Sequence, residues 1–361
     1  MKKKMAVYHY SWLPLSETFI HRQVLGLNRD FDVRLLTDSI VNERAFAGAD
    51  PILVPGEKFL GRLLFARDRF FRAQLAGCSL FHVNFGHIAV EMQRHARNSG
   101  LPMTVFFHGV DASSLLRNQA YCESLKNSIF AAYIVCSHDM ATRLRPYLPQ
   151  GAKVFVSYCG IRLDLIPYRR RTCVPEGALF LQVSRLSSKK GVDISLKAFR
   201  NYLDEVDSRA RFVIAGDGPL MDSLKALAHT LGLDGQVFFT GALPYAEVIK
   251  LLGEADVFLH PSVTDKAGDM EGIPNTIAEA MAAGLPVIAT RHSGIPELIE
   301  DAKSGILVAE NDAEELFAAM SVLRRAEVGT LSQRARERVD RMFNYEQTTS
   351  DLAGYLRDIV R

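Results

Sequence analysis

Few cysteines and no long apolar run set the first limits on this 361-residue sequence. The five cysteines are odd in number, widely spaced and form no Cys-x-x-Cys pair, which argues against a disulfide framework or a zinc site. No segment reaches the roughly 18 consecutive apolar residues of a membrane span. The short apolar run near the amino terminus is broken by His, Trp and Pro, so it predicts a first strand rather than a signal peptide. We therefore expect a cytoplasmic protein that is at most peripheral to the inner face of a membrane.

The sequence also has no large excess of positive or negative residues, since the formal net charge is only +2. Such a small charge does not by itself indicate a nucleic-acid partner. Hydrophobic residues make up 48% and charged residues 23% of the chain, as in ordinary globular domains. No Gly-x-Gly-x-x-Gly motif follows the first predicted strand, which disfavours a dinucleotide-dependent dehydrogenase.

Two series of short apolar runs, separated by amphipathic segments, are the main feature that is present. This rhythm is typical of parallel βαβ sheets covered on both faces. It predicts an α/β protein with two doubly wound, Rossmann-like domains facing a central cleft: a first domain over 1–165, a linker over 166–177 that contains Pro and three consecutive Arg, and a second domain over 178–344. The last helix, 345–361, is expected to pack back on the first domain. The predicted strands are 5–10, 32–37, 80–84, 103–108, 132–137 and 153–158, then 178–184, 211–216, 236–241, 256–261, 285–290 and 305–309.

Ligands bind such sheets at the carboxyl ends of the strands, so the loops there are the candidate site. Arg185 and Lys190 follow one strand and precede a helix start, where two cations suit a pyrophosphate; ordinary surface charges are the alternative. Gly216 and Asp217 lie in a tight turn after the next strand. The backbone of that turn either approaches the base or ribose of a nucleotide, or has a structural role alone.

The stretch EGIPNTIAEAMAAGLPVI begins with Glu271 and places Glu279 eight residues later. The helix is predicted to begin near Pro274 and Asn275, so the amides of about 273–276 are free to bind a phosphate. Glu279, one turn further in, is suited to a ribose diol, and Glu271 to sugar hydroxyls or to a developing positive charge. Helix capping alone would explain either glutamate singly, but explains less well the Gly and Pro that separate them.

Together these segments resemble the family-4 retaining glycosyltransferases of the GT-B fold. The resemblance rests on EGIPNTIAEAMAAGLPVIAT, HSGIPELI (292–299) and SGILV (304–308), preceded in order by VSRLSSKKGVDISLKAF, FVIAGDGP and VFLHPS. It covers most of 178–310 and extends into the first half through LSETFIHRQV (15–24), FFHGVD (106–111) and YCGI (158–161). The SETFI and DMEGIPN segments look most like the branch that builds bacterial exopolysaccharides, such as colanic-acid-type transferases.

The resemblance implies a role for each matching residue. Arg185 and Lys190 would neutralise the departing diphosphate, Glu279 would hold the ribose, and Glu271 would contact the donor sugar. The implied site has catalytic residues Arg185, Lys190, Glu271 and His108, donor-binding residues Glu279, Gly272, Ile273, Pro274, Asn275, Thr276, Gly216 and Asp217, and acceptor-side residues Ser16, Glu17, Thr18, Gly109 and Asp111. A lone histidine at a strand end is more often structural, so the prediction for His108 depends on the resemblance. Many relatives carry a Gly-Gly turn where this chain has Ser16–Thr18.

The implied reaction is transfer, with retention, from a nucleotide-sugar co-substrate to a glycan or lipid-linked glycan. Neither a cofactor nor a metal is expected, since no Asp-x-Asp motif appears near the cleft loops. Asp265 and Asp269 are spaced differently, and we expect them to shape their loop. A nucleotide-sugar epimerase and a non-catalytic nucleotide-sugar binding protein are the alternatives.

Residues 59–75 form an arginine-rich segment dense in Phe and Leu. One hypothesis is an interfacial helix that brings the enzyme to a lipid-linked acceptor. The other is a helix that packs on the core and exposes a basic outer face. Arg67, on the apolar side, weakens the membrane hypothesis.

Overall fold

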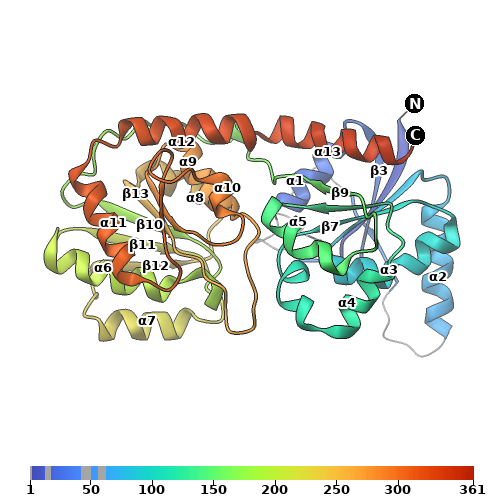
Figure 1. The fold of residues 1–361 in the computed structure, drawn as a ribbon, viewed down its shortest axis with the longest axis horizontal. Helices are drawn as coiled ribbons and strands as arrows, with labels where there is room; N and C mark the ends of the chain where they lie inside the picture. The colour runs from blue at the N-terminus through green and yellow to red at the C-terminus, as the bar shows by residue number, and fades with distance from the viewer. Residues whose placement is uncertain (1, 13–17, 42–49, 56–61) are drawn as a thin grey trace. The chain divides into compact units, whose positions relative to one another are not determined.

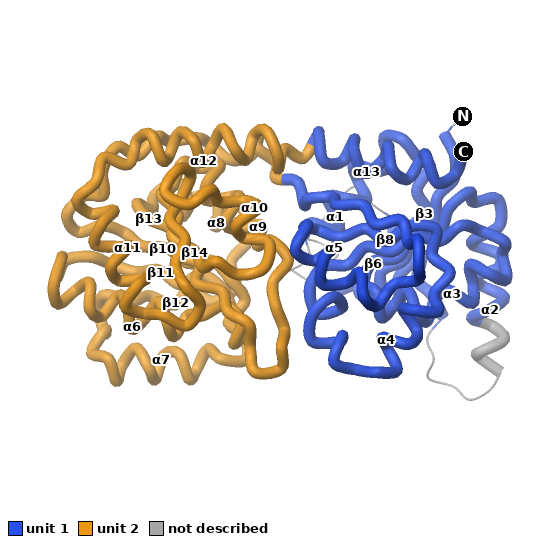
Figure 2. The backbone as a smooth tube through the Cα atoms, in the orientation of Figure 1, with its two compact units in different colours: residues 1–160, 346–361 blue, residues 161–345 orange. Residues whose placement is uncertain are grey.

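The chain folds into two compact units, each built on a parallel β-sheet (Figure 1). The computed structural model describes residues 2–12, 18–41, 50–55 and 62–361. Unit 1 consists of residues 1–160 and 346–361, and unit 2 of residues 161–345 (Figure 2). Every predicted strand is present. A short, nearly continuous apolar run between amphipathic helices is typical of a strand in a sheet whose two faces are covered by helices.

The sheet of unit 1 has the strand order β5-β3-β1-β6-β7-β8-β9. Its central strands are buried throughout, as their nearly continuous apolar sequence predicts. Two further short strands, β2 and β4, pair with each other outside this sheet. The strands are β1 Lys3–Tyr8, β2 Ser11–Trp12, β3 Phe31–Thr37, β4 Ser39–Ile40, β5 Ile52–Leu53, β6 Leu80–Asn84, β7 Met103–Phe107, β8 Ala132–Val135 and β9 Val154–Val156; the helices are α1 Thr18–Leu27, α2 Arg62–Leu75, α3 Gly86–Ser99, α4 Gln119–Lys126, α5 His138–Leu144 and α13 Tyr345–Ile359.

Helix α13 closes the hydrophobic core of unit 1, although it follows all of unit 2 in the sequence. Leu352 and Leu356 are buried in that core. The Tyr355 ring stacks on Phe155 of β9, with centroids 4.7 Å apart. The final helix therefore belongs to the first unit.

Helix α2 contains most of the segment 59–75, of which 59–61 lie outside the described residues. Phe71 and Leu75 are buried in the core of unit 1. Arg67 is buried as well, and its guanidinium lies 3.2 Å from the carboxylate of Asp38. Arg69 is exposed. The described part of this helix thus has the core-packing arrangement with a basic outer face.

The sheet of unit 2 has the strand order β12-β11-β10-β13-β14-β15, all parallel. Strand order reverses direction between β10 and β13, which is where doubly wound sheets bind ligands. The strands are β10 Leu179–Val183, β11 Arg211–Ala215, β12 Val237–Gly241, β13 Val257–His260, β14 Val287–Thr290 and β15 Ile306–Val308; the helices are α6 Val192–Glu205, α7 Met221–Thr230, α8 Tyr245–Glu254, α9 Asn275–Ala282, α10 Ile295–Leu298, α11 Ala313–Arg325 and α12 Gly329–Met342.

The segment predicted as a linker, 166–177, is instead an integral part of unit 2. The reason is Arg171, whose buried guanidinium donates hydrogen bonds to the carbonyls of Leu252, Gly253 and Ala255, 2.8–2.9 Å away, and also to Ala283. These carbonyls lie at the ends of α8 and α9, where helices lack internal donors. The prolines and arginines that suggested a linker therefore mark a packed segment.

The chain enters unit 2 at Ile161 and leaves it at Tyr345, and these two ends are joined. The Ile161 amide donates to the carbonyl of Phe343 at 2.7 Å, and the Tyr345 amide donates to the carbonyl of Ile161 at 3.1 Å. The boundary between the units thus falls at residues 160–161, before the predicted position of 165. Within the described ranges, no helix is long and apolar enough to cross a membrane.

Candidate functional site

The loop after β10 is held tightly against the loop after β13. Gly191, which precedes α6, has a φ of +59°, and a Cβ built there would lie 1.9 Å from the carbonyl oxygen of Pro261. Only glycine permits this approach. The carbonyl of Lys190 accepts a hydrogen bond from Gln182, whose own oxygen accepts one from Ser195. The backbone around Lys190 is therefore fixed before any ligand arrives.

Lys190 and Glu271 form a nearly buried ion pair, with Nζ 2.7 Å from Oε1. Burial raises the pKa of Glu271, but the charges of Lys190 and Lys189 more than offset it and hold the pKa at about 2. Glu271 is thus ionised at neutral pH. The cation expected at the diphosphate and the acid expected at the donor sugar are thus in direct contact.

The loop 265–271 has a framework of its own. Asp265 accepts hydrogen bonds from the Asp269 amide at 2.8 Å and from the Ser188 hydroxyl at 2.9 Å. Lys189 lies 2.9 Å from the carboxylate of Asp269. Asp265 and Asp269 therefore shape the loop, as the sequence predicts, and tie it to the turn that carries Lys190.

Helix α9 begins at Asn275, as predicted. Among the described residues, no hydrogen-bond acceptor faces the amides of Ile273, Asn275 and Thr276. They are unpaired donors at a helix amino terminus, which is an anion-binding arrangement. Glu279, one turn further along, is buried and accepts a hydrogen bond from the Tyr245 hydroxyl at 3.3 Å.

Arg185 contrasts with Lys190, because its side chain is exposed and forms no ion pair or hydrogen bond with any residue in the described ranges. It follows β10, at the carboxyl edge of the sheet that also carries Lys190. Among the described residues, Arg185 and the α9 amides both lack a partner and lie at the carboxyl edge of one sheet, which is suited to a polyanionic ligand.

The Gly216–Asp217 turn has a structural explanation. Gly216 has a φ of +143°, and a Cβ there would lie 1.9 Å from the carbonyl oxygen of Ser184. The Asp217 carbonyl accepts a hydrogen bond from the Leu186 amide at 2.9 Å, and its side chain caps the Gly218 amide. The turn thus supports the loop that carries Arg185.

In unit 1, His108 follows β7 and is enclosed by aromatic rings. Its Nε2 lies 2.8 Å from Oδ1 of Asn84, and its ring stacks on Phe106 with centroids 4.4 Å apart. Phe19 and Phe85 also contact the ring. Burial holds the pKa of His108 well below its usual range, so the ring is neutral and Nε2 donates to the Asn84 oxygen.

Asp111, predicted to lie on the acceptor side, is fully buried, and its carboxylate is occupied by backbone donors. It accepts hydrogen bonds from the amides of Gly86, His108 and Gly109 at 2.8–3.1 Å. A carboxylate so enclosed supports the backbone of the loop that carries His108. Thr18 begins α1; Ser16 and Glu17 lie outside the described residues.

Two buried histidines beside Glu271 were not predicted. His260, at the end of β13, is fully buried, and neither ring nitrogen has a hydrogen-bond partner among the described residues; burial, with Lys190 nearby, lowers its pKa to about 3. His292 lies within the HSGIPELI segment, and its Nε2 accepts the Glu271 amide at 3.0 Å. Its hydrogen-bond partner Glu310 is 18 positions further along the chain, and nothing in the sequence indicates that the two residues pair.

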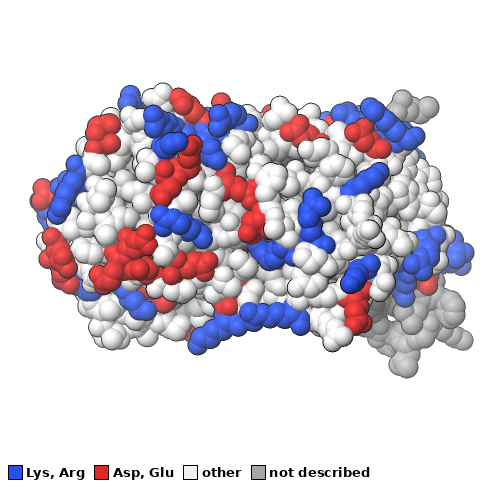
Figure 3. Space-filling model, viewed as in Figure 1, with Lys and Arg blue, Asp and Glu red and all other residues white. Residues whose placement is uncertain are grey.

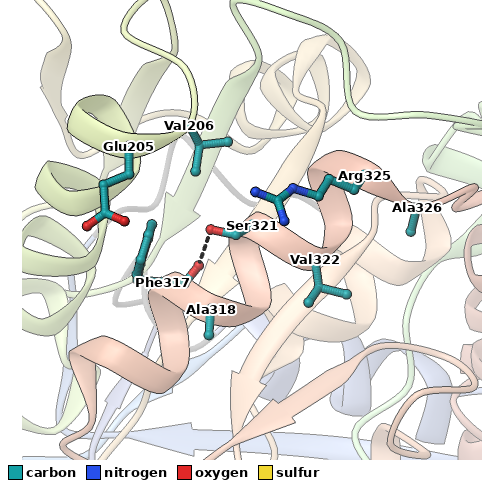
Figure 4. Close-up of a pocket in the computed structure, with 8 residues that line it drawn as sticks. All are labelled: Glu205, Val206, Phe317, Ala318, Ser321, Val322, Arg325 and Ala326. Carbon is teal, nitrogen blue, oxygen red and sulfur yellow. Dashed lines mark hydrogen bonds between the residues drawn. The ribbon is translucent and has the colours of Figure 1, made fainter.

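Surface charge and possible metal ligands also bear on the location of the site, whereas a surface pocket lies elsewhere in the fold. Side chains of both signs occur on the face shown in Figure 3. Within the described ranges, no group of His, Cys, Asp and Glu is arranged to hold a metal. A surface pocket of about 610 Å³ lies between the end of α6 and α11 (Figure 4), and it contains no candidate residue. It is lined by Glu205, Val206, Phe317, Ala318, Ser321, Val322, Arg325 and Ala326.

Comparison with known proteins gives the site a context. Residues 170–339 match the family model described as glycosyl transferases group 1. The amylovoran biosynthesis glycosyltransferase AmsK of Erwinia amylovora is 38% identical over 291 residues, which cover 78% of this chain and 70% of AmsK. WcaL of Escherichia coli K12, named for colanic acid biosynthesis, is 37% identical over 260 residues. That match covers 71% of this chain and 64% of WcaL, so the chain spans less than two thirds of this relative.

Solved structures show the same fold at low identity. Alr3699/HepE of Anabaena, in complex with UDP and glucose, superposes with a TM-score of 0.82, covering 99% of this chain and 100% of that one at 18% identity. WaaG, a glycosyltransferase involved in lipopolysaccharide biosynthesis, superposes with a TM-score of 0.73 over 97% of this chain and 99% of that one at 18% identity. The predicted GT-B class is thereby confirmed.

Proposed function

Because the chain belongs to the group 1 glycosyl transferases, we propose that it transfers a sugar, with retention of configuration, from a nucleotide-diphosphate sugar to a glycan or lipid-linked glycan of the bacterial surface. The observation that supports this most directly is the carboxyl edge of the unit 2 sheet. There Arg185 and the amides at the start of α9, which have no partner in the part of the chain that the structure describes, are suited to a diphosphate together with the fixed Lys190.

The proposed chemistry uses preorganised charge. Arg185, Lys190 and the α9 amides stabilise the negative charge that develops on the departing diphosphate. Glu279, with Tyr245, holds the ribose diol. Glu271 remains ionised, because its pKa lies at about 2, and faces the sugar where positive character develops. The diphosphate oxygen takes the acceptor proton as the new bond forms, so the chain supplies charge and position and no resident metal.

Thermal unfolding with nucleotides tests the donor side. A ligand that binds only the native state raises the unfolding midpoint with its affinity and concentration. UDP, GDP and ADP and their sugars are compared, with UDP first because HepE was solved with UDP. One nucleotide series should stabilise the wild type, and Arg185→Ala should lose most of that shift.

Arg211→Ala is the matched control, because Arg211 is an exposed arginine at the amino end of β11, on the opposite edge of the same sheet. It should keep the full shift. If no nucleotide at millimolar concentration stabilises the wild type, or if both variants respond alike, the donor site is wrongly assigned.

Product analysis tests the reaction itself. Transfer requires an acceptor, and the anomeric proton of the product should show the configuration of the donor. An altered sugar nucleotide formed without acceptor would instead identify an epimerase. Turnover should persist in EDTA.

Membrane contact, if it assists acceptor binding, would use the exposed cations of α2, Arg69 and Arg72. Sedimentation with anionic liposomes at low salt should then decrease in an Arg69→Ala/Arg72→Ala variant.

A further inference from the structure

His292 occupies a position in which its two ring nitrogens have opposite roles. It follows β14 and is completely buried. Nε2 lies 3.0 Å from the backbone nitrogen of Glu271, and Nδ1 lies 2.7 Å from Oε1 of Glu310. A backbone amide can only donate, so Nε2 carries no proton and accepts. The proton is then on Nδ1 and is donated to Glu310, which selects one of the two neutral tautomers.

Glu310 joins three strand ends. It follows β15, and while one oxygen accepts from His292 after β14, the other accepts from the Thr264 amide at 2.7 Å, in the loop after β13. Its side chain is 25% exposed, so most of it is shielded from water. One carboxylate thus connects the ends of β13, β14 and β15.

The peptide of Glu271 is held from both sides by consecutive residues. Its amide donates to His292, and its carbonyl accepts from the Ser293 hydroxyl at 2.8 Å. Ser293 has a φ of +46°, in the left-handed region that non-glycine residues rarely adopt. Such strain persists only where surrounding contacts over-determine it. These contacts direct the Glu271 side chain to Lys190.

From this geometry we infer that His292 and Glu310 are positioning residues for Glu271. Glu310 fixes the Nδ1-protonated tautomer of His292, and His292 in that form holds the Glu271 peptide, so that the carboxylate meets Lys190 and the donor sugar. The catalytic part of this inference rests on the proposed function. The tautomer part depends only on the hydrogen bonds.

Glu310→Gln tests the inference with little change of shape. Its amide oxygen can accept from only one of the two N–H groups, and its NH₂ group can donate to Nδ1. The ring proton then moves to Nε2, where it opposes the Glu271 amide. We expect kcat to fall about ten- to hundredfold, in line with the sensitivity of catalysis to small misplacements. The unfolding midpoint should fall by only a few degrees, because the cost is that of two buried N–H groups that oppose each other and lose one hydrogen bond.

Two substitutions of His292 separate its two hydrogen bonds. The side-chain oxygen of His292→Gln reaches the Nε2 position and can accept from Glu271, whereas the shorter His292→Asn can reach only Glu310. We expect His292→Gln to retain at least tenfold more kcat than His292→Asn. His229→Asn, which alters an exposed histidine of α7 paired with Asp234, is the control and should behave as the wild type.

Nitrogen-15 NMR of the imidazole groups gives a readout that does not require turnover. The wild-type His292 signal should show a protonated Nδ1 and an unprotonated Nε2, and Glu310→Gln should reverse them. The inference is overturned if the wild type shows the other tautomer, or if His292→Gln and His292→Asn lose activity equally while both remain folded. If the wild type transfers no sugar yet shows the expected tautomer, the proposed function fails and the tautomer assignment stands.

Discussion

Glu271 is a carboxylate whose buried charge depends on two neighbouring lysines. Its pKa is about 2, against 4.5 for a free glutamate, because Lys190 and Lys189 more than offset the effect of burial. A depressed pKa means that the native state holds the ionised form more strongly than the unfolded state does. The stabilisation is therefore complete above about pH 4.5 and is lost as the pH falls towards 2.

This linkage predicts an acid-sensitive component of stability. The free energy of unfolding, measured with urea, should decrease on the order of 3 kcal/mol between pH 4.5 and 2 through this one group. Glu271→Gln should be less stable than the wild type at pH 6, where Lys190 is left without its partner. Its stability should depend less steeply on pH in that interval. Parallel curves for the two proteins would show that Glu271 is not the titrating group.

Gly191 supports a second residue-scale prediction. Gly191→Ala should lower the free energy of unfolding by about 2 kcal/mol or more, because the left-handed conformation is costly for alanine and the added Cβ meets the Pro261 carbonyl. Gly253→Ala is the matched control, since it lies in α8 with no atom within 4 Å of the added Cβ. That change should be neutral or stabilising by up to about 1 kcal/mol. Equal effects in urea denaturation would contradict the close approach.

At the scale of elements, Arg171 binds the carboxyl ends of two helices together. Burial lowers its pKa to about 10, so it stays charged at neutral pH. The carbonyls that it satisfies belong to α8 and α9, and α9 carries Glu279 and the free amides of the candidate donor site. One guanidinium thus sets the orientation of the helix whose opposite end faces the proposed ligand.

Arg171→Met should therefore destabilise unit 2 by about 2–4 kcal/mol, because several buried carbonyls lose a charged donor. Arg171→Lys should fall between this variant and the wild type, since an ammonium cannot reach the carbonyls that the planar guanidinium spans. The adjacent Arg170→Met should cost much less, because Arg170 is exposed and makes one long hydrogen bond, 3.4 Å to the Gly329 carbonyl. Urea denaturation of all three variants is the measurement.

A feature can be predicted from the sequence when it depends on residues close together in the chain, and is missed when it depends on distant ones. The strands and the start of α9 depend on contiguous apolar runs and on Pro274, so they were predicted correctly. The role of 166–177 was not, because its arginine is satisfied by carbonyls some 80–110 positions away. His292 was missed for the same reason, since its role depends on a hydrogen bond to Glu310. The sequence also does not show that backbone amides enclose the carboxylate of Asp111.

At the scale of the whole molecule, unit 1 is formed by two separate stretches of the chain, and unit 2 lies between them in the sequence. Helix α13 is last in sequence but belongs to unit 1, where Lys3 of β1 also hydrogen-bonds to the carbonyl of Val360 at 2.6 Å. Removing α13 uncovers the apolar surface that receives Leu352 and Leu356.

Truncation after residue 345 should therefore destabilise unit 1 specifically. Hydrogen exchange should increase in β1, β3 and β9, while the strands of unit 2 stay protected. The untruncated chain with Tyr355→Ala, which removes the stack on Phe155 and keeps the rest of α13, should give a smaller change in the same strands. Increased exchange confined to unit 2 would contradict this assignment of α13.

The hydrogen bonds that join Ile161 to Phe343 and Tyr345 also have a consequence for how unit 2 can be exchanged by recombination. They bring the two ends of unit 2 together, and every residue proposed to bind the donor lies in the single stretch of chain between them. Two crossovers, near codons 161 and 345, exchange that stretch and leave all strands of the unit 1 sheet in the recipient. Under the proposed function, such an exchange replaces the candidate donor site as a whole and leaves the sequence of unit 1 unchanged.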